Sequence, residues 1–183
     1  MERQAGNICA RCSAGVPFNQ VVALTRYTPP ISDLICRLKY RRHIYLAKVL
    51  GILLADHIKK HRLSLPELLI VVPLHKKRIQ QRGFNQSVEI ARTVAARLNL
   101  KTDYRCIEKS KMTPLQTTLN SYQRRHNLKG AFRLHHPLSV KSVAVLDDVM
   151  TTGATVSEIA LLLKSYGVPR VEAWVLARTA PPL

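Results

Sequence analysis

The sequence is poor in acidic residues and aromatic residues, and it has no long apolar run. Only 11 of its 183 residues are Asp or Glu, against 29 Lys and Arg, so the formal net charge is +18. Such a charge attracts polyanions, either nucleic acid or phosphorylated small molecules. Aromatic residues make up only 5% of the chain, which argues against an extended platform for base stacking.

Neither a membrane-spanning segment nor a secretory signal is found in the sequence. The best apolar candidate, residues 46–58, is interrupted by Lys48, Asp56 and His57, whereas a spanning helix needs about 18 or more apolar residues. Residues 1–7 are polar and are followed by no apolar core of a signal peptide. We therefore expect a cytoplasmic protein that does not insert into a membrane.

A complete zinc site is also missing. Cys9 and Cys12 form a C-x-x-C pair, but the nearest following histidine is His43, far outside the usual ligand spacing. This spacing argues against an intramolecular zinc ion.

The hydrophobic pattern alternates between strands and helices. At 183 residues the chain is long enough to form one domain, and its 46% apolar residues are sufficient for a core. Short apolar runs predict strands, and apolar residues at helical spacing predict helices, one of them with Asn85 as its N-cap. The expected strands are 21–27, 68–72, 104–107, 143–146 and 171–176, and the expected helices are 31–40, 44–62, 85–98 and 154–166. This order predicts an α/β fold with a parallel sheet flanked by helices. Residues 110–130 are polar and basic, and we expect them to form an exposed excursion.

The strongest chemical signal is the segment 143–155, Val-Ala-Val-Leu-Asp-Asp-Val-Met-Thr-Thr-Gly-Ala-Thr. A buried strand brings Asp147 and Asp148 to its carboxyl end, where open α/β sheets bind ligands. Ionised carboxylates accept hydrogen bonds from vicinal ribose hydroxyls and supply the hard oxygen ligands that Mg²⁺ prefers. The loop that follows opens a helix, where backbone N–H groups bind anions, and its glycine allows close approach to a phosphate. The candidate phosphate-binding residues are Thr151, Thr152, Gly153, Ala154 and Thr155.

An alternative interpretation of this segment is structural, with a threonine that caps the helix and two aspartates in a polar turn. The contiguity of strand, carboxylate pair, threonine loop and helix favours a sugar-phosphate site. No Walker loop and no G-x-G-x-x-G fingerprint is present.

A second cluster follows the apolar strand that ends near residue 72. It is rich in basic residues and contains no acidic residue. At the same edge of the sheet it would suit a pyrophosphate group, and the alternative is an ordinary basic loop. Its candidate binding residues are Pro73, Leu74, His75, Lys76, Arg78 and Arg82.

These motifs resemble known families. The segment 143–155 resembles the 5-phosphoribosyl-1-pyrophosphate (PRPP) motif of type I phosphoribosyltransferases. Together with Val-Pro-Leu-His75, Arg78, Arg82-Gly-Phe-Asn-Gln86, Thr113-Pro-Leu-Gln116 and the run from Arg124 to Phe132, it resembles the ComF family of competence proteins and their GntX-like relatives. The segments Arg26-Tyr27 and Leu38-Lys39-Tyr40 also fit this family. The resemblance extends over residues 21–178.

The resemblance implies a type I phosphoribosyltransferase-like domain over residues 21–183, with a flexible hood at 113–130. Residues 1–20 would be the remnant of a cysteine-rich ribbon. Asp147 and Asp148 would be the catalytic residues, in contact with the ribose hydroxyls or with Mg²⁺ bound alongside PRPP, and Pro73 to Lys76 would contact pyrophosphate. The implied setting is competence, DNA uptake and natural transformation.

Two classes of function remain open at this point. As an enzyme, the protein would transfer a phosphoribosyl group to a nitrogen nucleophile and release pyrophosphate. As a non-catalytic module, it would hold single-stranded DNA for import or scavenging, with a competence helicase or DNA-processing protein as partner. Arg124 and Arg125 would contact DNA phosphates in the second case and belong to the hood in the first.

Overall fold

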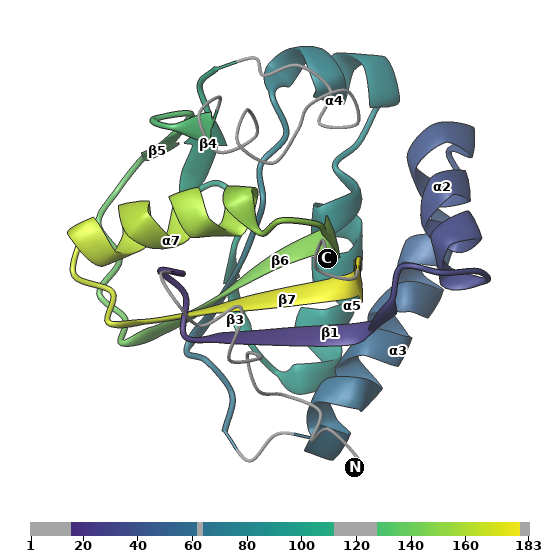
Figure 1. The fold of residues 1–183 in the computed structure, drawn as a ribbon, viewed down its shortest axis with the longest axis horizontal. Coiled ribbons are helices and arrows are strands. Elements are labelled where there is room, and N and C mark those ends of the chain that lie inside the picture. Colours follow the sequence, from purple (N-terminus) through teal and green to yellow (C-terminus); the bar gives the residue numbers. More distant parts are fainter. Residues whose placement is uncertain (1–15, 62–63, 112–127, 180–183) are drawn as a thin grey trace.

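The computed structural model describes residues 16–61, 64–111 and 128–179, and its centre is a five-stranded parallel sheet (Figure 1). The strand order is β1-β7-β6-β2-β3, and every neighbouring pair is parallel. The strands of this sheet are β1 (Gln20–Arg26), β2 (Leu68–Val71), β3 (Lys101–Asp103), β6 (Ser142–Met150) and β7 (Arg170–Arg178). The helices are α2 (Ile31–Arg41), α3 (Tyr45–His61), α4 (Lys76–Arg82), α5 (Gln86–Leu98) and α7 (Ala154–Ser165). The predicted fold class is confirmed.

Strand β6 lies in the middle of the sheet and is buried on both faces. Val143 and Val145 pack into the core on the side of α7, whereas Ala144 and Leu146 pack into the core formed with α3 and α5. All four side chains are fully buried. Burial on both faces explains why this strand is a continuous apolar run and not an alternating one.

The connections that leave β2 and β6 run in opposite directions along the sheet. From β2 the chain passes through α4 and α5 to β3, and from β6 it passes through α7 to β7. Where two adjacent parallel strands have diverging connections, their carboxyl ends leave a crevice in which ligands bind. Both clusters predicted from the sequence follow these two strands, so the topology brings them to the same edge.

The strand predicted at 104–107 is wrong. Strand β3 ends at Asp103, and a separate strand β4 (Ile107–Lys109) begins four residues later. The reason is local: Asp103 Oδ1 accepts hydrogen bonds from the backbone N–H groups of Arg105 (2.9 Å) and Cys106 (2.8 Å), which turns the chain. Strand β4 pairs antiparallel with β5 (Phe132–Leu134), which was not predicted.

Part of the predicted excursion at 110–130 and most of the predicted N-terminal segment lie outside the described residues. This applies to the hood residues Gln116, Arg124, Arg125 and Asn127 and to Cys9 and Cys12. The described flanks of the excursion lie together, because Lys109 of β4 pairs with Phe132 of β5. None of the helices in the described ranges combines the length and the apolar character needed to cross a membrane.

Candidate functional site

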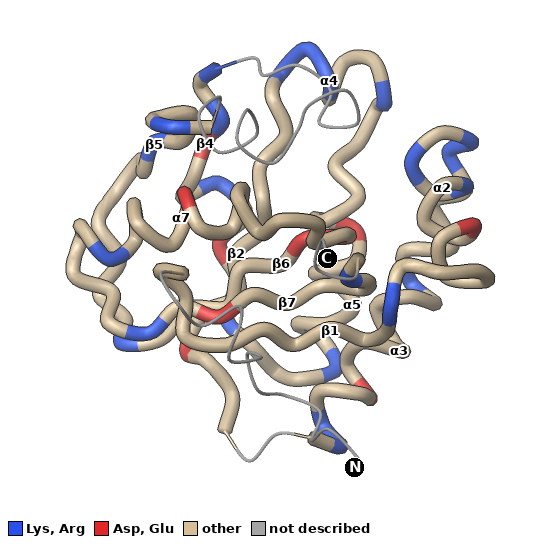
Figure 2. The backbone as a smooth tube through the Cα atoms, viewed as in Figure 1, with Lys and Arg blue, Asp and Glu red and all other residues tan. Residues whose placement is uncertain are grey.

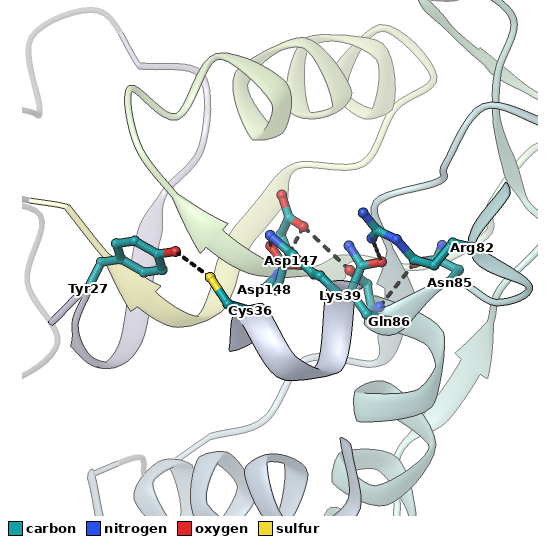
Figure 3. Close-up of polar contacts among 9 residues, drawn as sticks. Tyr27, Cys36, Lys39, Arg82, Asn85, Gln86, Asp147 and Asp148 are labelled. Carbon is teal, nitrogen blue, oxygen red and sulfur yellow. Dashed lines mark hydrogen bonds and ion pairs between the residues drawn. The ribbon is translucent and has the colours of Figure 1, made fainter. Parts of the chain in front are cut away.

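The two predicted carboxylates stand near the carboxyl end of β6 with opposite surroundings (Figure 3). Successive side chains of a strand point to opposite faces of the sheet. Asp148 therefore follows the row of Ala144 and Leu146, and only 3% of its surface is exposed. Asp147 follows the other row and remains partly exposed.

The buried carboxylate, Asp148, is compensated by a lysine of α2. The distance from Lys39 Nζ to Asp148 Oδ1 is 2.8 Å. Burial lowers the pKa of Lys39, but the charge of Asp148 and the hydrogen bond to it outweigh this effect, so that the pKa is raised. The second carboxylate oxygen, Asp148 Oδ2, is buried and has no hydrogen-bond partner among the described residues.

Asp147 is held by hydrogen bonds to one of its oxygens. Asp147 Oδ1 accepts the backbone N–H of Asp148 at 2.9 Å and the hydroxyl of Ser87, in the first turn of α5, at 3.4 Å. Burial and the charge of Asp148 raise the pKa of Asp147 to about 7, although Lys39 and both hydrogen bonds partly offset the shift. Ionisation of Asp147 is therefore less favourable in the folded protein than in the unfolded chain.

The predicted phosphate loop forms a tight turn between β6 and α7. Gly153 has φ +76°, and a Cβ atom at this position would lie 2.6 Å from Met150 Cε. The backbone therefore requires glycine here. Thr152 Oγ1 accepts the backbone N–H of Ala154 at 3.4 Å. Thr151 in this turn and Thr155 in the first turn of α7 are partly buried.

The basic cluster after β2 forms helix α4, where the sequence suggested a loop. Pro73 and Leu74 connect β2 to the N-cap residue His75, whose Nδ1 accepts the backbone N–H of Lys77 at 3.3 Å. Lys76 and Arg78 lie within the helix. The N–H of Val72 donates to the carbonyl oxygen of Leu146 at 2.9 Å. This hydrogen bond holds the end of β2, and with it the basic cluster, beside the end of β6.

Arg82 connects α4 with its neighbours. Its guanidinium donates to Gln86 Oε1 and lies 5.7 Å from the centre of the Tyr40 ring of α2. Asn85, the predicted N-cap of α5, accepts the backbone N–H of Ser87 at 3.0 Å and donates to the carbonyl of Val72 at 3.1 Å. The predicted cap is confirmed, and it fixes the start of α5 beside the end of β2.

Comparison with known proteins identifies the family. A sequence model of the phosphoribosyl transferase domain matches residues 85–181, the range that holds the carboxylate pair and the phosphate loop. The chain is 39% identical over 176 residues to "DNA utilization protein YhgH" of Escherichia coli O157:H7, covering 93% of this chain and 78% of that protein. It is 34% identical over 178 residues to "Competence protein F" of Haemophilus influenzae, with the same coverage of 93% and 78%. This chain belongs to the ComF family.

Among solved structures, a hypoxanthine phosphoribosyltransferase from Staphylococcus aureus is 19% identical to this ComF-family protein, with a TM-score of 0.40. That match covers 74% of this chain and 62% of the other.

Three residues of the site in this ComF-family protein were not predicted from the sequence. Lys39 and Ser87 contact the two carboxylates directly. Lys109 of β4 interacts with the site through its charge: burial and the charge of Arg78 lower its pKa to about 8, and the charge of Asp147 partly offsets this. All three come from elements far in sequence from Asp147. Lys39 lies in the family-like segment Leu38-Lys39-Tyr40, but that segment does not indicate a contact with the carboxylates.

The donor set fits Mg²⁺ that arrives with a ligand. The described residues include no group of three or more His, Cys, Asp or Glu side chains that could hold a metal ion. Mg²⁺ is commonly bound by one or two carboxylates together with substrate phosphates. Asp147 and Asp148 provide such a pair of carboxylates, and Oδ2 of Asp148 lacks a hydrogen-bond donor among the described residues.

We predict that Asp147→Asn stabilises the protein at pH 8 and not at pH 4. Because the pKa of Asp147 is raised in the folded state, the stability linked to its protonated form is fully present below about pH 4. That stability is lost as the pH rises through about 7. The neutral amide of the variant does not ionise, so its stability does not fall in this way. The expected gain in the free energy of unfolding at pH 8 is on the order of 2 kcal/mol, after allowance for solvent screening.

Urea unfolding at pH 4, 6 and 8 measures the effect. Asp56→Asn, at an exposed carboxylate of α3, is the control. An equal gain in both variants, or a gain that does not change with pH, would contradict the assignment of the titration to Asp147.

Proposed function

We propose that this ComF-family protein binds a phosphoribosyl pyrophosphate-type ligand together with Mg²⁺ at the carboxyl end of β6, and that it acts in the uptake and use of DNA. The observation that supports the ligand is the carboxylate pair placed directly before the Gly153 turn and the start of α7. A sugar with vicinal hydroxyls and a terminal phosphate matches this order of groups.

Each part of the ligand has a matching group at the site. Asp147 and Asp148 suit the ribose hydroxyls and the ligand-borne Mg²⁺, and the turn from Thr151 to Thr155 suits the 5-phosphate. The segment from Pro73 to Lys76, with Arg78 and Arg82, suits the pyrophosphate. The hydrogen bond between Val72 and Leu146 supports this assignment, because it sets the ends of β2 and β6 side by side. Pro73 and Asp147 are the next residues of the two chain segments.

The proposed reaction is a transfer of the phosphoribosyl group. A nitrogen nucleophile forms a bond to the anomeric carbon, and the bond from that carbon to the pyrophosphate oxygen breaks. The carboxylates would stabilise the cationic sugar in the transition state, and Arg78 and Lys109 would stabilise the departing pyrophosphate. The DNA setting rests on the names of the relatives, "DNA utilization protein YhgH" and "Competence protein F".

Calorimetric titration of PRPP with MgCl₂ tests the ligand. We expect micromolar binding to the wild type and a loss of at least about thirtyfold in the double variant Asp147→Asn, Asp148→Asn, since each lost charge-assisted contact contributes about 1.5–3 kcal/mol. The double variant Asp33→Asn, Asp56→Asn removes two exposed carboxylates outside the site and should bind like the wild type. Absence of binding to folded wild type would refute the proposed ligand.

The phosphate turn can be tested separately with two glycines that lie at opposite ends of α7. Gly153 and Gly167 both have positive φ, +76° and +87°. Alanine at either position should lower the free energy of unfolding by about 1 kcal/mol, because a side chain disfavours this conformation, and the loss should be larger at Gly153, where Cβ would also overlap Met150 Cε. Only Gly153→Ala should also weaken PRPP binding, by at least about fivefold. Equal PRPP affinities in the two variants would argue against a phosphate at this turn.

A second candidate function, binding of single-stranded DNA, is favoured by the surface beside the site. Figure 2 shows Lys and Arg on α2 and α4, the helices that follow β1 and β2 in the chain. Arg37 and Arg41 of α2 are exposed, and 67% of the Tyr40 surface between them is accessible. A basic surface with an exposed ring is typical of sites that track a single strand.

Fluorescence anisotropy with a labelled oligo-dT strand tests this surface. Binding should weaken steeply with salt, and Arg37→Ala with Arg41→Ala should reduce the slope of log affinity against log salt by about 1.4, because each phosphate contact contributes about 0.7. Lys59→Ala with Lys60→Ala, at the far end of α3, should leave the slope unchanged. An equal change in both variants would contradict a specific site on α2.

A further inference from the structure

The ion pair between Lys39 and Asp148 joins the site to a part of the chain that precedes the matched domain. Lys39 lies on α2, whereas the phosphoribosyl transferase match begins at residue 85. The pair is 2.8 Å long, and its side chains are 19% exposed for Lys39 and 5% exposed for Asp148. The lysine is therefore the more exposed member of the pair.

Lys39 is held firmly in this place by its neighbours on α2. Ile35 and Leu38 are fully buried in the core with α3 and α5. Tyr40 lies under the guanidinium of Arg82, and on the same helix Cys36 contacts the hydroxyl of Tyr27 at 3.6 Å. The backbone at residue 39 is thus fixed on both sides, while the flexible lysine side chain retains its rotatable bonds.

Both carboxylate oxygens of Asp148 are enclosed in this arrangement. Its Oδ1 is paired with Lys39, and its Oδ2 is buried without a hydrogen-bond partner among the described residues. A buried carboxylate oxygen without a donor is unfavourable, because its lost hydration is not replaced. A sugar hydroxyl or cation that binds Asp148 Oδ1 must therefore compete with the ammonium group of Lys39.

We propose that Lys39 is an exchangeable counter-cation of Asp148, which leaves the carboxylate when a divalent cation arrives with the ligand and then pairs with a phosphate oxygen of that ligand. The part of this inference that concerns the phosphate rests on the proposed function, but the exchange at Asp148 does not. Lys39 suits this role because its stem is long and unbranched and its side chain is the more exposed of the pair. No covalent bond changes in the exchange.

Binding of Mn²⁺ alone, measured from the free-ion signal in electron paramagnetic resonance, tests the exchange without any ligand or activity. Lys39→Met removes the competing charge, so this variant should bind Mn²⁺ at least tenfold more tightly than the wild type. Adding Asp148→Asn should abolish the gain. Lys77→Met, which removes an exposed lysine from α4 near the same edge of the sheet, is the control for general electrostatics and should change the affinity less than twofold.

Lys39→Arg provides a second test that keeps the charge and does not leave Asp148 uncompensated. The planar guanidinium can pair with both oxygens of Asp148 at once, so it should be harder to displace, and Mn²⁺ affinity should fall at least threefold. Unchanged Mn²⁺ affinity in both Lys39 variants would overturn the proposal and leave a static ion pair. A gain in Lys77→Met equal to that in Lys39→Met would also overturn it.

Titration of PRPP with MgCl₂ into the same variants separates this proposal from the proposed function. If Lys39 moves to the phosphate, Lys39→Met should bind PRPP at least threefold more weakly even though it binds Mn²⁺ more tightly. Equal or tighter PRPP binding by Lys39→Met would overturn the transfer to phosphate. A wild type that binds no PRPP would refute the proposed ligand, while the Mn²⁺ series would still decide whether Lys39 exchanges at Asp148.

Discussion

Compensation of the charge on Asp148 is the constraint on which the arrangement of this site depends. Strand β6 is buried on both faces, yet it carries two adjacent carboxylates toward its end. An unpaired charge in such a place is strongly unfavourable, so one carboxylate needs a cation and the other needs hydrogen-bond donors. Lys39 meets the first need, and the N–H of Asp148 with the hydroxyl of Ser87 meets the second. Helices α2 and α5 therefore supply the groups that compensate the two carboxylates.

The site is assembled from parts of the chain that are far apart in sequence. The β6–α7 turn supplies the carboxylates and the glycine, the segment after β2 supplies basic groups, and β4 adds Lys109. Adjacent parallel strands β2 and β6 with diverging connections make this convergence possible. Helix α2 lies outside the range that matches the phosphoribosyl transferase domain, and it adds a cation to the carboxylate pair of that domain.

Sequence patterns predicted the elements whose signals are local. The apolar run before Asp147, the N-cap at Asn85 and the glycine at position 153 each identified an element or turn that the structure contains. The predictions failed where the signal was weak or non-local. Helix α4 has no buried residue and hence no apolar period, and the turn at Asp103 depends on one side chain that accepts two backbone N–H groups. Strand β5 has only three residues and is defined by its pairing with β4.

The sequence by itself determined the family, the α/β class and the two clusters that lie at the carboxyl ends of β2 and β6. Each of these depends on residues that are close together in the chain, where spacing and periodicity can be recognised. Only the tertiary structure decided which cation reaches which carboxylate. Lys39 is one of 29 basic residues, and although Leu38-Lys39-Tyr40 belongs to the family resemblance, no sequence pattern indicates its role at the carboxylates. Its role arises because the buried face of α2 brings it within 2.8 Å of Asp148, a contact that depends on packing across the whole domain.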